Sequence, residues 1–501
     1  MSSPAKKRKK DAPTPGTRSI ASFFQGQAAK QAEPTPPAGE DTDHTLSDEA
    51  LARKLQAEWN QQDAASALES GTTPGLAPTP KQDQPTAASS EPIEDDQEPQ
   101  KKIRKTNTLS LQSTAGTEDT ISLAVPFDES PLTFDSRKYA DELKAQWAPG
   151  GGNASYALLT RAFVLANATS SRIKIVDTLV NFLRVLIEGD PSSVLPAVWL
   201  ATNSISPPYD ESELGLGGSS ISKALKKVYG LNSQGLKSLY DRLGDAGDVA
   251  FEAKKRQSFT LMKPKPLTIK GVYQSLQKIA TSKGSGSQEN KQRVVEKLLQ
   301  DTRGAEESRY IARTLVQNLR IGAVKTTMLI ALARAFLYSK PDGTGFETRS
   351  VEELARLKKE ELAEVYSNAE EIIKASYARH PDYNDLVPCL LEIGVTTELL
   401  VRCGLQLHIP LRPMLGSITR DLTEMLTKLQ GRDFTCEYKY DGQRAQVHCD
   451  ETGKVSIFSR HLEKMTEKYP DLVSLVPEIR GESVSSFILE GEVVAVDQET
   501  G

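Results

Sequence analysis

The pattern of hydrophobic and polar positions changes twice along the chain. Up to about residue 121, apolar residues are sparse; from about 122 to 402 they recur at helical spacing; after that they alternate as in strands. The helical spacing is clearest in three groups, namely Val176, Leu179, Val180, Leu183 and Leu186, then Ile311, Leu315 and Leu319, then Val324, Met328 and Leu332. The middle segment is therefore predicted to be an all-α unit of roughly a dozen helices, with a capping box at residues 350–353 opening one of them over residues 354–367.

The first segment, residues 1–121, is rich in Pro, Ser, Thr, Gln and acidic residues. Such a composition buries too little apolar surface to offset the entropy lost on ordering, so we expect a disordered tail. Basic runs at residues 6–10 and 101–105 interrupt it. Each is either a nuclear-import or nucleic-acid-binding segment or a solvated charge run.

Two short apolar groups also interrupt the tail. Ile20, Phe23 and Phe24 stand at positions i, i+3 and i+4, and this group resembles the peptide box that binds the sliding clamp of replication, PCNA, although Thr17 stands where Gln is usual. The alternative is a chance apolar cluster. Residues 47–59 predict a short amphipathic helix that either docks on a partner or forms transiently.

Composition narrows the class of protein further. The chain has 501 residues, too many for one domain of about 150 residues, and its net charge of −5 excludes a globally basic binder. The four cysteines form no CxxC pair, which argues against a zinc site and against a disulfide framework. No run of 18 apolar residues and no secretory signal stand out, so we expect an intracellular protein.

Several connectors of the helical segment suit the phosphate backbone of DNA. Residues 281–287 supply small hydroxyls, glycine amides and one ammonium before a helix expected to start near Asn290, and residues 318–322 turn tightly after another helix. The residues that we select as DNA-binding are Ser282, Lys283, Gly284, Ser285, Arg320 and Gly322. For any single lysine or arginine here, a solvated helix face is the better explanation, and only the residues taken together favour contact with the DNA backbone.

Strands and a K-x-D-G motif follow residue 410. Lys439, Asp441 and Gly442 form the motif, which precedes a predicted hairpin with strands at residues 445–449 and 454–458. Val447 and Cys449, with Val455 and Ile457, alternate as one buried face. A lysine amine can attack the α-phosphorus of a nucleotide only when deprotonated, so its free pKa of ~10.4 must fall through desolvation or nearby cations.

Charged side chains near this motif suit phosphate and metal. Arg444 and Arg460 can bind phosphate in a bidentate way, and Glu490 and Glu492, two apart on a strand, point to one face as candidate Mg²⁺ ligands. The alternatives are an exposed acid pair on an edge strand and a surface lysine at position 439.

Residues 308–322 and 240–250 resemble the DNA-binding domain of eukaryotic ATP-dependent DNA ligases. Residues 434–446, 457–460, 468–471 and 486–489 resemble the adenylation domain of the DNA ligase I type in fungi. The resemblance covers residues 125–501 and the clamp box. It implies three parts, namely a tail over 1–121, a helical DNA-binding domain over 122–402 and the first part of an α+β nucleotidyltransferase domain over 403–501.

The resemblance also implies roles. Lys439 would carry the adenylyl group, Glu437 would contact the adenine side of ATP, and Arg444 and Arg460 would contact the nucleotide or the 5′-phosphate of a nick. Glu492 would bind Mg²⁺ or the ribose. His461 stands where the family usually has Asn, and Glu490 where Asp is common.

The implied enzyme is a nuclear, monomeric DNA ligase that uses ATP and Mg²⁺ to seal nicked duplex DNA in replication, repair and recombination. AMP would pass from ATP to Lys439 and then to the 5′-phosphate, and the 3′-hydroxyl would displace it. The family carries further strands and an OB-fold domain that residues 1–501 do not contain, so we expect this chain to be a fragment that does not seal nicks, with its self-adenylylation open.

Two other classes remain open. One is a non-enzymatic protein that binds DNA and the clamp. The other is a different lysine nucleotidyltransferase, such as an mRNA capping enzyme or an RNA ligase, against which the large helical segment argues.

Overall fold

The computed structural model describes residues 112–113, 119–257, 259–260, 264–323, 325–414, 421–435, 439–497 and 499. The clamp-binding group Ile20, Phe23 and Phe24 and both basic runs lie outside these residues. None of the helices within them is long and apolar enough to cross a bilayer.

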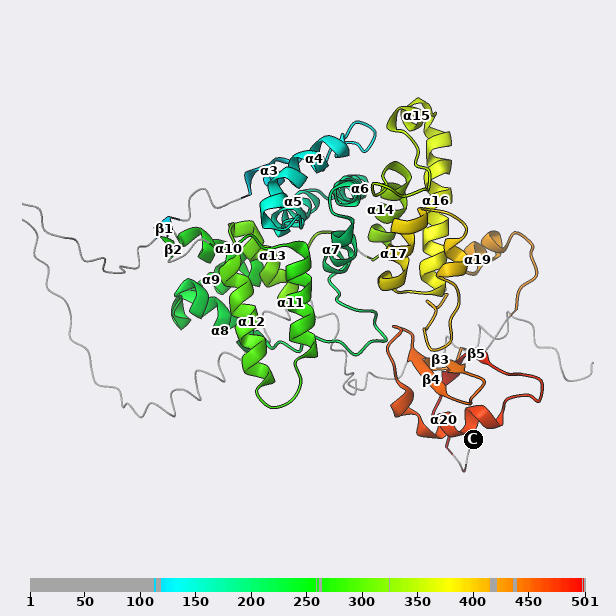
Figure 1. Ribbon diagram of the computed structural model, residues 1–501. Helices are drawn as coiled ribbons and strands as arrows, with labels where there is room; N and C mark the ends of the chain where they lie inside the picture. The colour runs from blue at the N-terminus through cyan, green and yellow to red at the C-terminus, as the bar shows by residue number, and fades with distance from the viewer. Residues whose placement is uncertain are drawn as a thin grey trace, which may run out of the picture. The chain divides into compact units, whose positions relative to one another are not determined.

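The described residues form a helical part followed by a mixed part (Figure 1). The α-helices are α3 (Thr120–Ala124), α4 (Ser136–Trp147), α5 (Tyr156–Asn167), α6 (Arg172–Gly189), α7 (Val194–Ala201), α8 (Gly218–Tyr229), α9 (Ser233–Leu243), α10 (Ala246–Arg256), α11 (Ile269–Thr281), α12 (Ser287–Asp301), α13 (Ala305–Leu315), α14 (Lys325–Tyr338), α15 (Val351–Arg356), α16 (Lys359–Arg379), α17 (Tyr383–Ile393), α18 (Leu399–Arg402), α19 (Leu422–Leu429) and α20 (Pro470–Glu478). The strands are β1 (Gln112–Ser113), β2 (Phe259–Thr260), β3 (Gln443–Cys449), β4 (Val455–Ser459) and β5 (Phe487–Val493). The coarse prediction of an all-helical unit followed by a mixed α+β part is confirmed.

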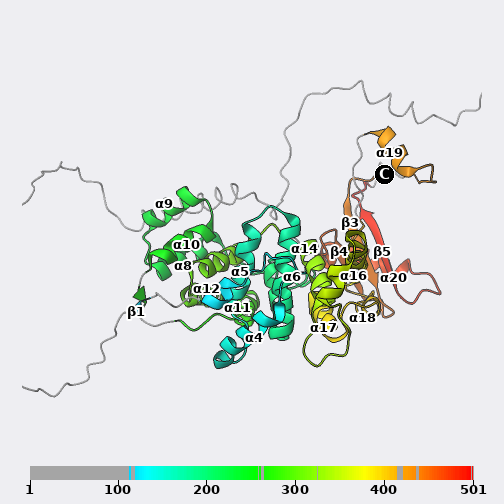
Figure 2. The ribbon, with the colours of Figure 1, turned by 90° about the horizontal axis from the view of Figure 1, so that it is seen from above.

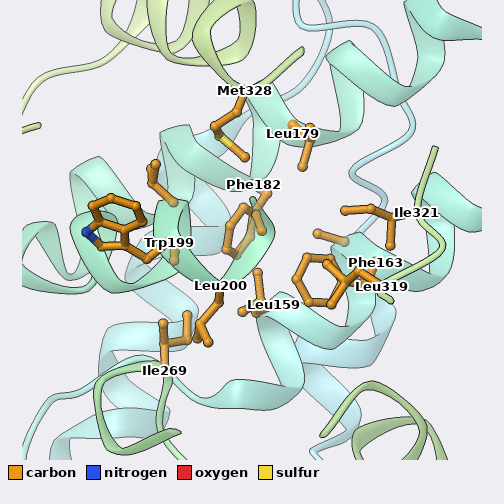
Figure 3. Packing of buried hydrophobic residues seen from close by; sticks show 14 of the residues in the cluster. Leu159, Phe163, Leu179, Phe182, Trp199, Leu200, Ile269, Leu319, Ile321 and Met328 are labelled. Atoms are coloured by element: carbon orange, nitrogen blue, oxygen red, sulfur yellow. The ribbon is translucent and has the colours of Figure 1, made fainter. Parts of the chain in front are cut away.

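The helical part shares one hydrophobic core. Figure 3 shows Phe163, Phe182 and Trp199 converging from three helices, with Leu159 and Leu200 between them. The indole N–H of Trp199 is not left unpaired, because Nε1 donates to Oδ1 of Asn384 at 3.1 Å. All five predicted core residues of α6 are buried, as its spacing predicts.

Helix α14 lies between α6 and α16 (Figure 2), and α10 lies along α13 (Figure 1). The α10–α13 contact requires a glycine, since a Cβ at Gly247 would lie 2.5 Å from Cγ of Arg313 and 2.8 Å from the carbonyl oxygen of Arg309. Arg313 is buried there and its Nε donates to Oδ2 of Asp245 at 3.0 Å. Asp245 also accepts from the backbone N–H of Asp248 and so caps α10.

Three predicted boundaries differ from the structure. The helix expected over residues 354–367 is split, because Ser350 caps the short α15 while α16 begins anew at Lys359, where Glu361 accepts from the backbone N–H of Lys358. Helix α13 ends at Leu315 because Gln317 adopts a left-handed backbone, although Leu319 is still buried. The hairpin strands run over 443–449 and 455–459, each displaced slightly from the prediction.

Helix α13 also carries a carboxyl group inside the core. Glu307 is only 5% exposed, and burial raises its pKa to about 7, while the backbone N–H of Arg303 donates to Oε2 at 2.6 Å. The folded state therefore takes up a proton that the unfolded chain, with its ordinary carboxyl pKa, releases near pH 4.5. Protonated Glu307 therefore contributes to the free energy of unfolding at acidic pH, and this contribution is lost as the pH rises to about 7.

We expect Glu307→Gln to stabilise the helical part at pH 8 and to change it much less at pH 5. The amide keeps the acceptor oxygen but never becomes charged, so the variant gains roughly 2 to 3 kcal/mol more at pH 8 than at pH 5. Denaturant unfolding followed by helical circular dichroism at both pH values measures this difference. An equal effect at the two pH values would contradict it.

Candidate active site

The second core is formed by a three-stranded antiparallel sheet in the order β4–β3–β5, with α20 packed against it. One face of β3 carries Ala445, Val447 and Cys449, all buried with Ile457 of β4 beneath them. Val455 completes the buried alternation that the sequence predicts. The opposite face of β3 consequently presents Arg444, Gln446 and His448, because side chains alternate along a strand.

The register of the sheet brings several predicted site residues to one end of it. Arg444 pairs with Glu492 of β5, and Ala445 pairs with Ser459, the last residue of β4. Lys439 lies four residues before β3, and Arg460 directly follows β4, so both lie at this same end. Glu490 pairs with Gln446 and therefore shares the face of Arg444 and Glu492.

Lys439 lies in the short loop that leads into β3, and its side chain is exposed. Glycine is required where this loop meets the sheet, because a Cβ at Gly442 would lie 2.4 Å from the carbonyl oxygen of Val493 and 2.6 Å from Cγ1 of Val494. The close approach fixes the loop against the end of β5. Glu437, predicted to contact adenine, lies outside the described residues.

Arg444 is held by two acceptors. Its NH2 donates to Oε2 of Glu490 at 2.6 Å, and its NH1 donates to the carbonyl oxygen of Met414 at 3.4 Å. The side chain stays 31% exposed, so the guanidinium is fixed in place and still reachable from solvent. Glu490, which the sequence suggested as a candidate Mg²⁺ ligand together with Glu492, is thus the hydrogen-bond partner of the predicted nucleotide-binding arginine.

Arg460 and Glu492 are exposed on the same end of the sheet. The turn after β4 is fixed by Ser459, whose hydroxyl accepts from the backbone N–H groups of His461 and Glu463, both at 3.2 Å. Among the residues that the structure describes, no cluster of three or more His, Cys, Asp or Glu side chains could hold a metal by itself. Glu492 offers one hard oxygen ligand, which suits a Mg²⁺ ion whose other ligands are phosphates and water.

The predicted DNA-binding residues lie on two separate connectors. The first joins α11 to α12, where Gly284 and Gly286 have φ of +87° and +78° and Lys283 is exposed. Helix α12 begins at Ser287, three residues before the predicted start, and no side chain caps it. Its first amide groups are therefore not occupied by a capping side chain, whereas the Ser282 hydroxyl donates to the carbonyl oxygen of Lys278 at 2.6 Å.

The second connector joins α13 to α14 and carries Arg320 and Gly322, with φ of +53° and +67°. Arg320 Nε lies 3.9 Å from Oδ1 of Asp245, the carboxylate that also accepts from Arg313. Arg320 therefore has a structural contact in addition to its predicted role. The sequence analysis singled out the segment 240–250, in which Asp245 lies, but not this contact.

Sequence reasoning did not select Gln446 and His448, although both are polar residues buried in β3. Polar and apolar residues alternate along β3, and Gln446 and His448 occupy the polar positions. Such a pattern normally means that the polar face is exposed, so it gives the position of these two residues but not their burial. Each has one partner in residues 404–414, Leu411 for Gln446 and His408 for His448, and no pattern of β3 could reveal the position of that segment.

The geometry is that of a lysine at the end of an antiparallel sheet beside two arginines and a strand carboxylate, preceded by a helical part. Two family models match these regions, one described as "DNA ligase N terminus" over residues 155–333 and one as "ATP dependent DNA ligase domain" over residues 413–501. Residues 155–333 and 413–501 thus belong to two domains of the ATP-dependent DNA ligase family.

Curated relatives agree with this family. The chain is 39% identical to DNA ligase 3 of Schizosaccharomyces pombe over 92% of its own length and 58% of the relative's. It is 36% identical to DNA ligase 1 of the same organism, covering 75% of the chain and 46% of the relative. It is 32% identical to DNA ligase 1 of Saccharomyces cerevisiae, and the match covers 70% of the chain and 45% of the relative. The chain thus spans about half the length of these relatives.

We expect Gly442→Ala to detach the Lys439 loop from β5 while β3 and β4 stay paired. The added methyl group has no room beside the carbonyl group of Val493, so the backbone must move. Hydrogen exchange read by mass spectrometry should show faster exchange in the amides of 439–443 and 493–494. Gly453→Ala in the hairpin turn is the control, since nothing lies within 4 Å of a Cβ there and only its φ of +83° is strained. Unchanged exchange at 439–443 in Gly442→Ala would contradict the requirement.

Proposed function

We propose that the whole protein to which this chain belongs seals nicks in duplex DNA with ATP, through an adenylyl group carried on Lys439. The observation that carries the proposal is the arrangement of Lys439, Arg444, Arg460 and Glu492 at one end of the sheet. These are the residue types that transfer of a nucleotidyl group needs, namely an amine nucleophile, cations for phosphate and a carboxylate for the metal. Family membership supports the same reading.

The exposed lysine would attack the α-phosphorus of ATP while pyrophosphate leaves. Arg444, fixed by Glu490, would bind phosphate oxygens, and Arg460 would stabilise the charge that develops on phosphate or on the 5′-phosphate of the nick. Glu492 would help to hold Mg²⁺, which supplies charge neutralisation on the phosphates. AMP would then pass to the 5′-phosphate, and the 3′-hydroxyl would close the strand.

The helical part would hold the duplex by its backbone. One contact with the DNA backbone would be made by the glycine amides, the uncapped start of α12 and Lys283. The other would be made by the turn of Arg320 and Gly322. Such contacts neutralise phosphates without reading bases, as an enzyme that acts on any nick requires. We further propose a nuclear location, action in replication, repair and recombination, and a clamp contact through Ile20, Phe23 and Phe24.

Replacing Lys439 by arginine tests the chemistry. Arginine keeps the positive charge but does not deprotonate at neutral pH, so it cannot act as the nucleophile. With α-labelled ATP and Mg²⁺, we expect covalent label on the parent and none on Lys439→Arg. Lys454→Arg, in the hairpin turn at the other end of the sheet, is the matched control and should label as the parent does. Label that persists on Lys439→Arg, or an unlabelled parent that still binds nicked DNA, would refute the adenylyl-lysine proposal.

Charge reversal at Lys283 tests the DNA contact. We expect Lys283→Glu to weaken binding of a nicked duplex several-fold and to reduce the slope of log affinity against log salt by about one, because one phosphate contact is lost. Lys138→Glu on α4, an exposed lysine outside both connectors, is the control. Fluorescence anisotropy over a salt series measures both. Equal losses for the two variants would mean that only net charge matters and that the connector makes no specific contact.

A further inference from the structure

Residues 404–414, called the connector here, run from α18 towards the sheet and are bonded to β3. The backbone N–H of Leu411 donates to Oε1 of Gln446 at 2.8 Å, and Nε2 of Gln446 donates back to the carbonyl oxygen of Leu411 at 3.1 Å. This pair of bonds imitates one step of a strand ladder with a side-chain amide in place of a backbone. Gln446 is only 3% exposed, so losing it would leave buried polar groups unpaired.

The neighbouring residue of the connector bonds to the helical part. The backbone N–H of Arg412 donates to the carbonyl oxygen of Ala378 in α16 at 2.8 Å, and its guanidinium lies 6.0 Å from the ring centroid of Tyr377. Adjacent residues thus bind α16 on one side and β3 on the other. A shift of the connector at one contact is transmitted to the other because a single peptide unit separates them.

Two histidines fix the start of the connector. The backbone N–H of His408 donates to Nδ1 of His448 at 3.0 Å, and Nε2 of His448 lies 2.9 Å from Oε1 of Gln446. These partners assign the neutral form with the proton on Nε2, and burial lowers the pKa of His448 to about 4, in keeping with that form. His408 in turn contacts Ser456 Oγ at 2.8 Å and Asp450 Oδ2 at 3.1 Å.

The same amide of Gln446 reaches the site. Nε2 of Gln446 also donates to Oε1 of Glu490 at 3.2 Å, while Oε2 of Glu490 accepts from Arg444 at 2.6 Å. Both oxygens of Glu490 are therefore engaged, one by each neighbour on β3. The connector touches Arg444 directly as well, through the carbonyl oxygen of Met414. The contacts form an unbroken path from α16 through the connector to the arginine beside the Lys439 loop.

We propose that Gln446 and Glu490 are positioning residues through which the connector sets the place of Arg444. In this arrangement, the connector's contacts with α16 and β3 determine whether the guanidinium stands ready for phosphate. The role of Arg444 in binding phosphate rests on the proposed function. The link from the connector to Arg444 rests on the hydrogen bonds alone.

The link is tested without ATP or DNA by the reactivity of Arg444 toward an arginine-directed dicarbonyl reagent, read peptide by peptide by mass spectrometry. In the parent, Arg444 should react more slowly than the exposed Arg460. Glu490→Gln and Gln446→Leu should each raise its rate by about tenfold, the loss of one charge-assisted hydrogen bond. Glu490→Asp, which keeps the carboxylate, should restore most of the protection. Glu482→Gln, an exposed acid elsewhere in the same part, is the charge-matched control.

Gln446→Leu should also speed hydrogen exchange at the Leu411 amide, whereas Glu490→Gln should leave that amide protected. This difference separates transmission through the link from general unfolding, which would expose both. An unchanged Arg444 rate in both variants, or loss of Leu411 protection in both, would overturn the proposal.

The consequence for the proposed function is measured separately. Glu490→Gln should raise the ATP concentration needed for half-maximal labelling of Lys439 by about tenfold, and Glu490→Asp should reverse most of that change. A parent that takes no label refutes the proposed function and leaves the dicarbonyl result to decide the link. Altered Arg444 reactivity with unchanged dependence on ATP would confine the link to structure and refute its role in phosphate binding.

Discussion

The pairing of β3 with β4 on one side and β5 on the other is the constraint on which the candidate site depends. Antiparallel register fixes which side chains stand opposite each other, and a slip of one residue would turn Arg444, Gln446 and His448 into the core. The buried face of Val447, Cys449 and Ile457 makes such a slip costly. The contact of Gly442 with Val493 then ends the ladder where the Lys439 loop begins.

In the helical part, the carboxylate of Asp245 contacts three elements. Asp245 caps α10, accepts from the buried Arg313 of α13 and lies near Arg320 in the following turn. Removing it would leave a guanidinium that is 5% exposed without its main partner, which is far costlier than losing a surface ion pair. The turn proposed to contact DNA therefore lies near the same carboxylate that joins α10 to α13.

Much of this architecture is encoded in local pattern. The apolar spacing of α6 and the alternation in β3 and β4 predicted both elements and their buried faces, because burial of a contiguous face is a property of the sequence itself. The division of residues 350–379 into α15 and α16 was missed, since a helix break at residues 357–358 contains no glycine or proline. The motif of Lys439 was recognisable from the sequence because Asp441 and Gly442 follow the lysine at a fixed spacing. The roles of Glu490, Gln446 and His448 were not, because the partners that define them, Arg444, Leu411 and His408, are at least 35 residues away along the chain.

The central claim is that Lys439 receives the nucleotide at the end of this sheet. A crystal structure of the protein with ATP and Mg²⁺ tests it most directly. We expect the α-phosphate beside Nζ of Lys439, or already joined to it, with Arg444 or Arg460 on phosphate oxygens and Glu492 towards the metal. A nucleotide bound elsewhere in the molecule, with Lys439 turned away from every phosphate, would contradict the account.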